Sequence, residues 1–163
     1  MNVLNLYLKE LEEEAAITRK MLERIPKDKY DWQPHTKSMN IVTLANHIAE
    51  LPYWVNMSLN MDVLDFAASP YQPPTFRSSK DLIKFMDKGM EEATGCLTQS
   101  KEEVLEESWV LKTGDEIHWE TTKGDALRMS VSQMIHHRAQ LGVYLRLLDV
   151  PIPGSYGPSA DEA

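Results

Sequence analysis

Residues 127–148 read LRMSVSQMIHHRAQLGVYLRLL, and one largely apolar face runs through the whole stretch. The residues that share this face recur every three or four positions: Leu127, Ser130, Met134, His137, Leu141, Tyr144 and Leu148. That spacing is typical of a helix packed against a protein core. The sequence therefore predicts a long amphipathic helix from about Gly124 to Val150, with the imidazole of His137 on its buried side.

Three further segments show helical periodicity. The first extends from Val3 to Ile25 and ends at Pro26, because the residue before a proline avoids the helical conformation. The second begins near Asn40, a favourable N-cap residue, and the third follows Ser78 with an acidic residue three positions later. Because long connections separate the helices, we expect an all-α fold: a four-helix bundle with long crossover connections, in a single domain over residues 1–163.

The segments outside the apolar faces leave two alternatives open. Pro52 lies inside the second helix and removes a backbone hydrogen bond, so that helix either kinks or breaks. Between the third and fourth helices, residues 109–111 and 116–119 either pair as a short hairpin around residues 112–115 or form an irregular segment. The turn-rich tail, residues 154–163, is expected to be loosely held.

The chain is acidic, with 25 Asp and Glu residues against 17 Lys and Arg residues and a net charge of −8. Most of such a surface would repel a phosphate backbone, so we expect no nucleic-acid partner. The sequence has no apolar run of membrane length and no basic-then-apolar leader, so we expect a cytoplasmic protein without a membrane partner. The single cysteine, Cys96, is expected to be a small buried hydrophobe rather than a catalytic thiol.

Two histidines on buried helix faces are the main clue to function. His47 lies between Leu44 and Leu51 on the second helix, in the same relation to its core face as His137 has on the fourth. Inward side chains of facing helices build the metal sites of bundles, and neutral imidazole binds ions of the zinc and nickel type. A site with three protein ligands leaves positions open for water, as in catalytic centres.

The third ligand is the weak part of this prediction. The position one turn before His137 is Gln133, whose amide oxygen is a poor ligand for such metals. The alternative is a pair of core histidines, each hydrogen-bonded to a neighbour, and spacing alone favours that alternative. Glu50 lies one turn after His47 and either orients its ring or faces water.

Other side chains near the two histidines have less specific signals. Trp54 and Tyr144 lie on the same helix faces, where they would line a pocket or simply pack in the core. His136 points about 100° away from His137 on the helix and is expected at the surface or at an interface. The sequence contains no phosphate-binding loop, nucleophile elbow or H-E-x-x-H helix, so no catalytic residue is predicted.

Four segments of the chain resemble the DinB family of damage-inducible-like bundle proteins. They are WQPHTKS at 32–38, LANHIAELPYW at 44–54, HHRAQLGVYLR at 136–146 and VPIPGSYGPSADE at 150–162. The resemblance covers essentially the whole chain, in order. It implies a four-helix bundle, usually dimeric, with a divalent metal held by three histidines. Two of these match His47 and His137, and the third falls on Gln133.

The resemblance leads to two expectations of function. The first is a metal-dependent enzyme that acts on a small molecule, either a hydrolase or a thiol-dependent transferase of the kind known among members. Nickel, zinc or iron would then be held by His47, His137 and, as a weak third ligand, Gln133. The second is a metal-free bundle that binds a small molecule or a partner, because Gln133 replaces the usual histidine. The resemblance also implies a homodimer, with His136 as a candidate contact.

Overall fold

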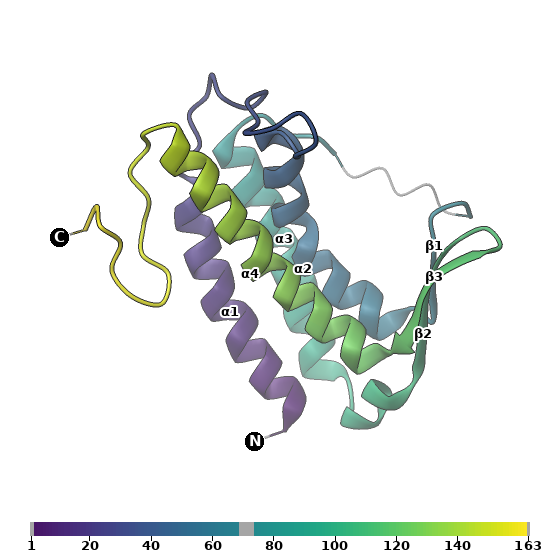
Figure 1. The fold of residues 1–163 in the computed structure, drawn as a ribbon. Helices are drawn as coiled ribbons and strands as arrows, with labels where there is room; N and C mark the ends of the chain where they lie inside the picture. Colours follow the sequence, from purple (N-terminus) through teal and green to yellow (C-terminus); the bar gives the residue numbers. More distant parts are fainter. Residues whose placement is uncertain (1, 69–73, 163) are drawn as a thin grey trace.

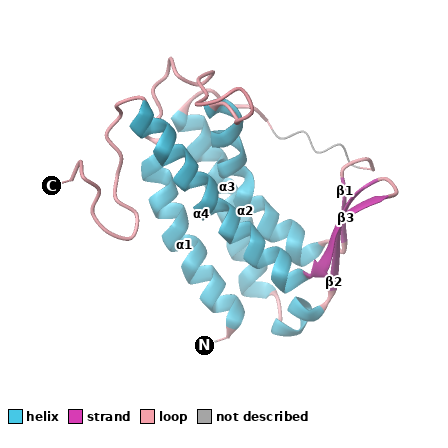
Figure 2. Cartoon of the chain, in the orientation of Figure 1, coloured by secondary structure: helices cyan, strands magenta, loops and turns pink. Residues whose placement is uncertain are grey.

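The computed structural model describes residues 2–68 and 74–162, and four long helices make up most of that part (Figures 1 and 2). They are α1 (Val3–Leu22), α2 (Ile41–Asn60), α3 (Ser79–Gln99) and α4 (Lys123–Leu147). The expected caps are present, because the side chain of Asn40 accepts the N–H of Thr43 and that of Ser78 accepts the N–H of Asp81. These caps satisfy backbone donors that have no partner inside the helix.

The helices pack as a bundle in which consecutive helices are not always neighbours. Helices α1 and α2 each pack against α3 and α4. Figure 1 shows α1 and α4 running in one direction and α2 and α3 in the other. Helices α1 and α2 lie at diagonal positions of the bundle, so the connection between them crosses one end of the bundle. Helices α2 and α3 run parallel, so the connection between them spans its length. The predicted bundle with long connections is therefore confirmed.

A small sheet covers the end of the bundle where α2 ends and α4 begins (Figure 1). Strands β2 (Ser108–Thr113) and β3 (Glu116–Thr122) form an antiparallel hairpin, and β1 (Val63–Asp65) pairs with β2 in parallel. The hairpin alternative is therefore confirmed, whereas the all-α class is wrong in part. Strand β1 has only three residues, too few for an alternating pattern to appear in the sequence.

Buried side chains attach this sheet to the helices. Trp109 is fully buried and packs with Leu64 and Ala126, and its indole N–H donates to the carbonyl of Met57 at 3.4 Å. The ammonium group of Lys123, at the start of α4, lies 2.8 Å from Asp62 and 2.7 Å from Glu107. The sheet therefore holds the first turn of α4 in position.

Helix α2 continues through Pro52 to Asn60, so the alternative of a break at Pro52 is wrong. The helix packs closely on α3 at this turn: a Cβ atom added at Gly89 would lie 2.8 Å from ring carbons of Tyr53 and 3.1 Å from Cβ of Pro52. The absence of a side chain at Gly89 therefore allows α2 and α3 to approach each other.

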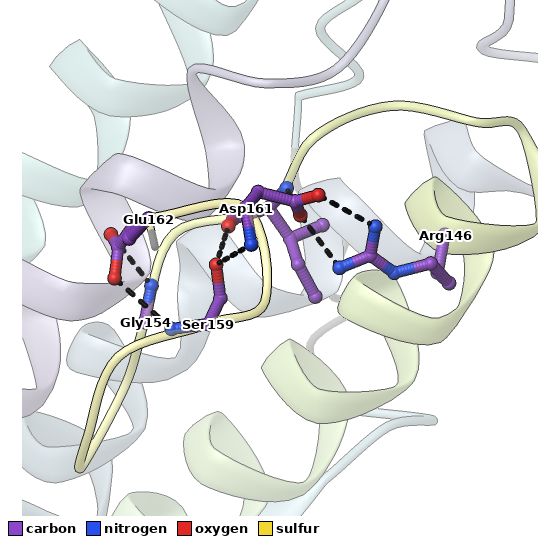
Figure 3. Close-up of polar contacts among 6 residues, drawn as sticks. Arg146, Gly154, Ser159, Asp161 and Glu162 are labelled. Atoms are coloured by element: carbon purple, nitrogen blue, oxygen red, sulfur yellow. Dashed lines mark hydrogen bonds and ion pairs between the residues drawn. The ribbon is translucent and has the colours of Figure 1, made fainter.

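The C-terminal tail returns beside the bundle after α4 and is held by polar contacts (Figures 1 and 3). Both terminal nitrogens of Arg146 donate to the carboxylate of Asp161, at 3.0 and 2.6 Å. Asp161 also accepts the N–H of Ile152, and Glu162 accepts the N–H groups of Gly154 and Ser159. The sequence did not indicate these contacts, and the mobility expected for the tail stays a prediction.

Candidate functional site

The fold brings His47 and His137 face to face. His47 lies in the second turn of α2, and His137 lies in the middle of α4, which runs antiparallel to α2. Their ring centroids are 4.7 Å apart, with an angle of 72° between the ring planes. His137 is buried, whereas the side chain of His47 keeps 24% of its surface exposed. The pair therefore sits at the edge of the core, within reach of solvent on the α2 side.

Each histidine ring is held by an acceptor one turn further along its own helix. Nδ1 of His47 lies 2.6 Å from Oε1 of Glu50, and Nδ1 of His137 lies 2.8 Å from Oε1 of Gln140. Because both acceptors are oxygens, Nδ1 of each neutral ring carries the proton. The Nε2 atoms then have free lone pairs, the form in which imidazole binds metals. Glu50 orients the ring of His47, so the alternative that Glu50 faces water is wrong.

The surroundings of His137 favour its neutral form. Burial lowers the pKa of His137 from its ordinary value of 6.5, whereas its bond to Gln140 raises it. The neighbouring rings of His47 and His136 lower the pKa of His137 further. The ring of His136 lies 4.9 Å away between centroids and is exposed, as expected. His137 is therefore uncharged near neutral pH.

Gln133 lies close to His137, but its amide oxygen is a poor metal ligand. The two residues line one shallow cavity of about 320 Å³ on α4, together with His136. Among residues 2–68 and 74–162, no group of three or more His, Cys, Asp or Glu side chains could hold a metal ion. The third ligand predicted beside the two imidazoles is the amide oxygen of Gln133, which lines the same cavity as His137.

The two imidazoles themselves fit a shared divalent ion. Metal–nitrogen bonds of about 2.0–2.1 Å from two Nε2 atoms in tetrahedral geometry would put the ring centres roughly 5 Å apart. The observed separation of 4.7 Å is close to that value. The ring separation thus agrees with a weak metal site of two imidazoles, with the amide of Gln133 as a poor third ligand.

A separate cavity of about 350 Å³ opens beside His47. Its lining combines apolar side chains, two threonine hydroxyls and the polar groups of α2: Met39, Val42, Thr43, Asn46, His47, Glu50, Pro74 and Thr75. Asn46 secures the far wall, because its amide donates to the carbonyl of Phe76 and accepts the N–H of Phe76, both at 2.8 Å. The amide of Asn46 also donates to Val42 in the preceding turn.

Trp54 and Tyr144, the two predicted pocket residues, do not line the cavity beside His47. Tyr144 is buried in the core with its ring against Trp32, at a centroid distance of 5.6 Å. Trp54 packs between the core cluster that includes Leu51 and Val55 and the cluster around Trp109 of the sheet. Its buried indole N–H has no hydrogen-bond partner in the described part of the chain. No sequence pattern indicated the His47 cavity.

The remaining cysteine and histidine side chains lie apart from the pair. His118 contacts the hydroxyl of Thr113 in the hairpin, and Nδ1 of His35 accepts the N–H of Lys37. Cys96 is half-buried between the side chains of Asn56 and Asn60, rather than fully buried as expected. Burial raises the pKa of the Cys96 thiol, which opposes a catalytic role.

The fold and site define a helical bundle with a histidine pair between two antiparallel helices. The family model described as the DinB family matches residues 1–163, and the chain belongs to that family. It is 28% identical over 131 residues to the uncharacterized protein YjoA of Bacillus subtilis, a match that covers 80% of each chain. None of the described helices is long and apolar enough to span a membrane.

Solved structures of DinB-like proteins share the fold. The crystal structure of YjoA matches with a TM-score of 0.69 and 23% identity, covering 92% of this chain and 96% of that one. A DinB-like protein from Bacillus cereus has a TM-score of 0.69 and 19% identity, with 92% and 95% covered. A protein assigned to the DinB family from Exiguobacterium sibiricum has a TM-score of 0.68 and 18% identity, with 100% and 99% covered.

Proposed function

We propose that this protein is a metal-dependent enzyme of the DinB type, a hydrolase or thiol-dependent transferase that acts on a small molecule. The observation that carries the proposal is the facing pair of His47 and His137, with both Nδ1 atoms occupied by acceptors. Their Nε2 atoms would hold nickel, zinc or iron, with Gln133 as a weak third ligand. When bound, such an ion would lower the pKa of a coordinated water or thiol.

The neighbouring residues support chemistry at this place. The carboxylate of Glu50 holds the His47 ring through Nδ1, the contact that outer-shell carboxylates make in metal sites. The cavity beside His47 has the size of a small-molecule site. Its apolar wall would exclude water from a bound substrate, while the hydroxyls of Thr43 and Thr75 would orient it.

A metal-free binding protein is the second candidate function. The observation that favours it is the amide side chain at Gln133, because two imidazoles alone bind an ion weakly. In this case the pair of histidines is a polar contact between α2 and α4. The cavity beside His47 would then bind a small molecule without chemistry.

We also propose that two copies of the chain associate in the cytoplasm. The outer face of α4 carries the exposed side chains of His136, Val143 and Leu147, and the last two are 58% and 59% exposed. Covering such apolar groups in a symmetric contact would be favourable. The acidic surface argues against a nucleic-acid partner.

Elemental analysis of protein purified without an affinity tag tests the proposed function. We expect bound nickel, zinc or iron in the natural chain after exposure to each ion, and its loss in His47→Ala and His137→Ala. His118→Ala is the matched control, because it removes a histidine of the hairpin and should leave the metal in place. Equal metal content in His47→Ala would overturn the histidine site. A natural chain that binds none of the three ions would favour the second candidate.

A further inference from the structure

A buried ion pair lies on the side of α4 that faces α1, whereas the histidine site faces α2. Arg138 is 2% exposed, and one of its terminal nitrogens contacts the carboxylate of Glu14 on α1, itself only 5% exposed. The same nitrogen lies 3.3 Å from both the carbonyl of Glu14 and the hydroxyl of Thr18. Because a buried charge is costly unless it is paired and hydrogen-bonded, this arrangement must be well satisfied to be stable.

The C-terminal tail completes the pair through Tyr156. The hydroxyl of Tyr156 accepts from the second terminal nitrogen of Arg138 at 2.9 Å and donates to Oε1 of Glu14 at 2.8 Å. Both carboxylate oxygens of Glu14 are thereby occupied, one by Arg138 and one by Tyr156. Tyr156 is 71% exposed, and it is attached to the bundle by the bonds of its hydroxyl and by the guanidinium of Arg138, which lies over its ring at 5.5 Å from the centroid.

Further hydrogen bonds fix the conformation of the tail around Tyr156. Its carboxylates at Asp161 and Glu162 bind Arg146 of α4 and three backbone N–H groups of the tail itself (Figure 3). The hydroxyl of Ser159 donates to the carbonyl of Ile152 at 2.6 Å. These bonds close residues 152–162, here named the clasp, into a loop with Tyr156 near its middle.

Arg138 connects the clasp to the histidine site because it directly follows His137. Successive side chains of a helix diverge by about 100°, so Arg138 faces α1 while His137 faces α2. The turn of α4 that carries His137 is thus held from two sides. A rotation or slide of α4 that moved His137 away from His47 would also break the bonds of Arg138.

We propose that Tyr156 is a positioning residue for His137, and that the clasp acts through Arg138 and Glu14 to set the place of this turn of α4. The bonds of the clasp fix this turn of α4 on the side that faces α1. They thereby keep His137 in contact with His47 on the side that faces α2. The part of the inference that concerns metal affinity rests on the proposed function. The part that concerns the orientation of the His137 ring does not.

The test compares Tyr156→Phe with Tyr53→Phe, both in the full chain. Each substitution removes one tyrosine hydroxyl, but Tyr53 donates to the carbonyl of Phe85 on α3, away from α4. The first measurement is the nitrogen NMR shifts of the histidine rings in metal-free protein at about pH 8, where free imidazoles are neutral. We expect the His137 signals to move in Tyr156→Phe and in Asp161→Asn, and to stay in place in Tyr53→Phe.

The second measurement is the affinity for Ni²⁺ by titration calorimetry. We expect Tyr156→Phe to bind Ni²⁺ about threefold to tenfold more weakly, less than the 10–100-fold typical when a direct orienting partner is lost. Tyr53→Phe should bind as the natural chain does. His137 signals that stay in place in Tyr156→Phe, or that move equally in Tyr53→Phe, would overturn the positioning role. A natural chain that binds none of Ni²⁺, Zn²⁺ and Fe²⁺ would instead contradict the proposed function and leave the ring measurement to decide the role of the clasp.

Discussion

Replacing Arg138 by methionine should destabilise the fold strongly. The side chain is 2% exposed and carries the only cation in contact with the carboxylate of Glu14 among the hydrogen bonds and ion pairs of the described residues. Methionine fills a similar volume but cannot donate. Glu14 would keep the bond from Tyr156 on one oxygen, while the other would lose its charged partner inside the α1–α4 interface.

The size of the loss follows from the burial of both partners. Breaking a buried ion pair by removing one partner typically costs about 3–5 kcal/mol, because an uncompensated charge remains. The surviving bond from Tyr156 puts the expected value near the lower end, about 3 kcal/mol. For a chain of this length each kcal/mol shifts the melting temperature by about 2–4 °C, so Tm should fall by roughly 10 °C.

Thermal and urea unfolding of four proteins would check this value. Arg77→Met is the control, because the Arg77–Asp31 pair is exposed and its loss should change the unfolding free energy little. The double variant Glu14→Gln, Arg138→Met should regain much of the stability, since no unpaired charge remains buried. If Arg138→Met cost no more than Arg77→Met, or if Glu14→Gln gave no recovery, the reasoning from a buried pair would be refuted.

Four further predictions concern the site, the packing and the assembly. Gln133→His should raise the affinity for Ni²⁺ or Zn²⁺ at least tenfold, because imidazole replaces an amide oxygen; equal affinities in calorimetry would remove position 133 from the site. Burial depresses the pKa of His137, so the unfolded chain takes up this proton at higher pH than the folded chain. The stability contributed by His137 should therefore be present above about pH 6.5 and be lost, with any bound metal, as pH falls through its folded pKa; pH-independent Tm and metal content would contradict this. Gly89→Ala should destabilise by about 1–2 kcal/mol because its Cβ meets the Tyr53 ring, whereas Gly95→Ala, with open space at the added Cβ, should stabilise by up to about 1 kcal/mol; the reverse order in urea unfolding would disprove the close packing. Light scattering at micromolar concentration should give twice the 18.7 kDa chain mass, and His136→Asp should lower it; a monomer at all concentrations would disprove the dimer.

The helices and the inward direction of the two histidines were predictable because both depend on local spacing. A repeat of three and four residues puts His137 on the buried face of its helix and His47 at the edge of the buried face of the other. The caps at Asn40 and Ser78 are equally local, since each side chain bonds an N–H three residues ahead. The contact between His47 and Glu50 was foreseen as an alternative for the same reason.

The cavity beside His47 was not predictable, because helix spacing gives a direction but not a neighbour. Trp54 and Tyr144 do lie on the predicted faces, yet Tyr144 is covered by Trp32 from the connection between α1 and α2. The cavity beside His47 is lined by Pro74 and Thr75, which follow a proline-rich connection, and the next residue, Phe76, is bonded to Asn46 of α2. Nothing in the local pattern indicates where such a connection will rest.

The sequence by itself determined the elements of this protein: four amphipathic helices, their caps, two inward histidines and the amide at Gln133 in place of a third. The tertiary structure alone decided which of these groups meet. It paired β1 with β2, brought the rings of His47 and His137 to 4.7 Å, and joined Glu14 to Arg138 and Tyr156 across most of the chain. Local patterns follow from backbone geometry over a few residues, whereas these contacts depend on how whole helices pack, and on the burial that makes each charged or polar group find a partner.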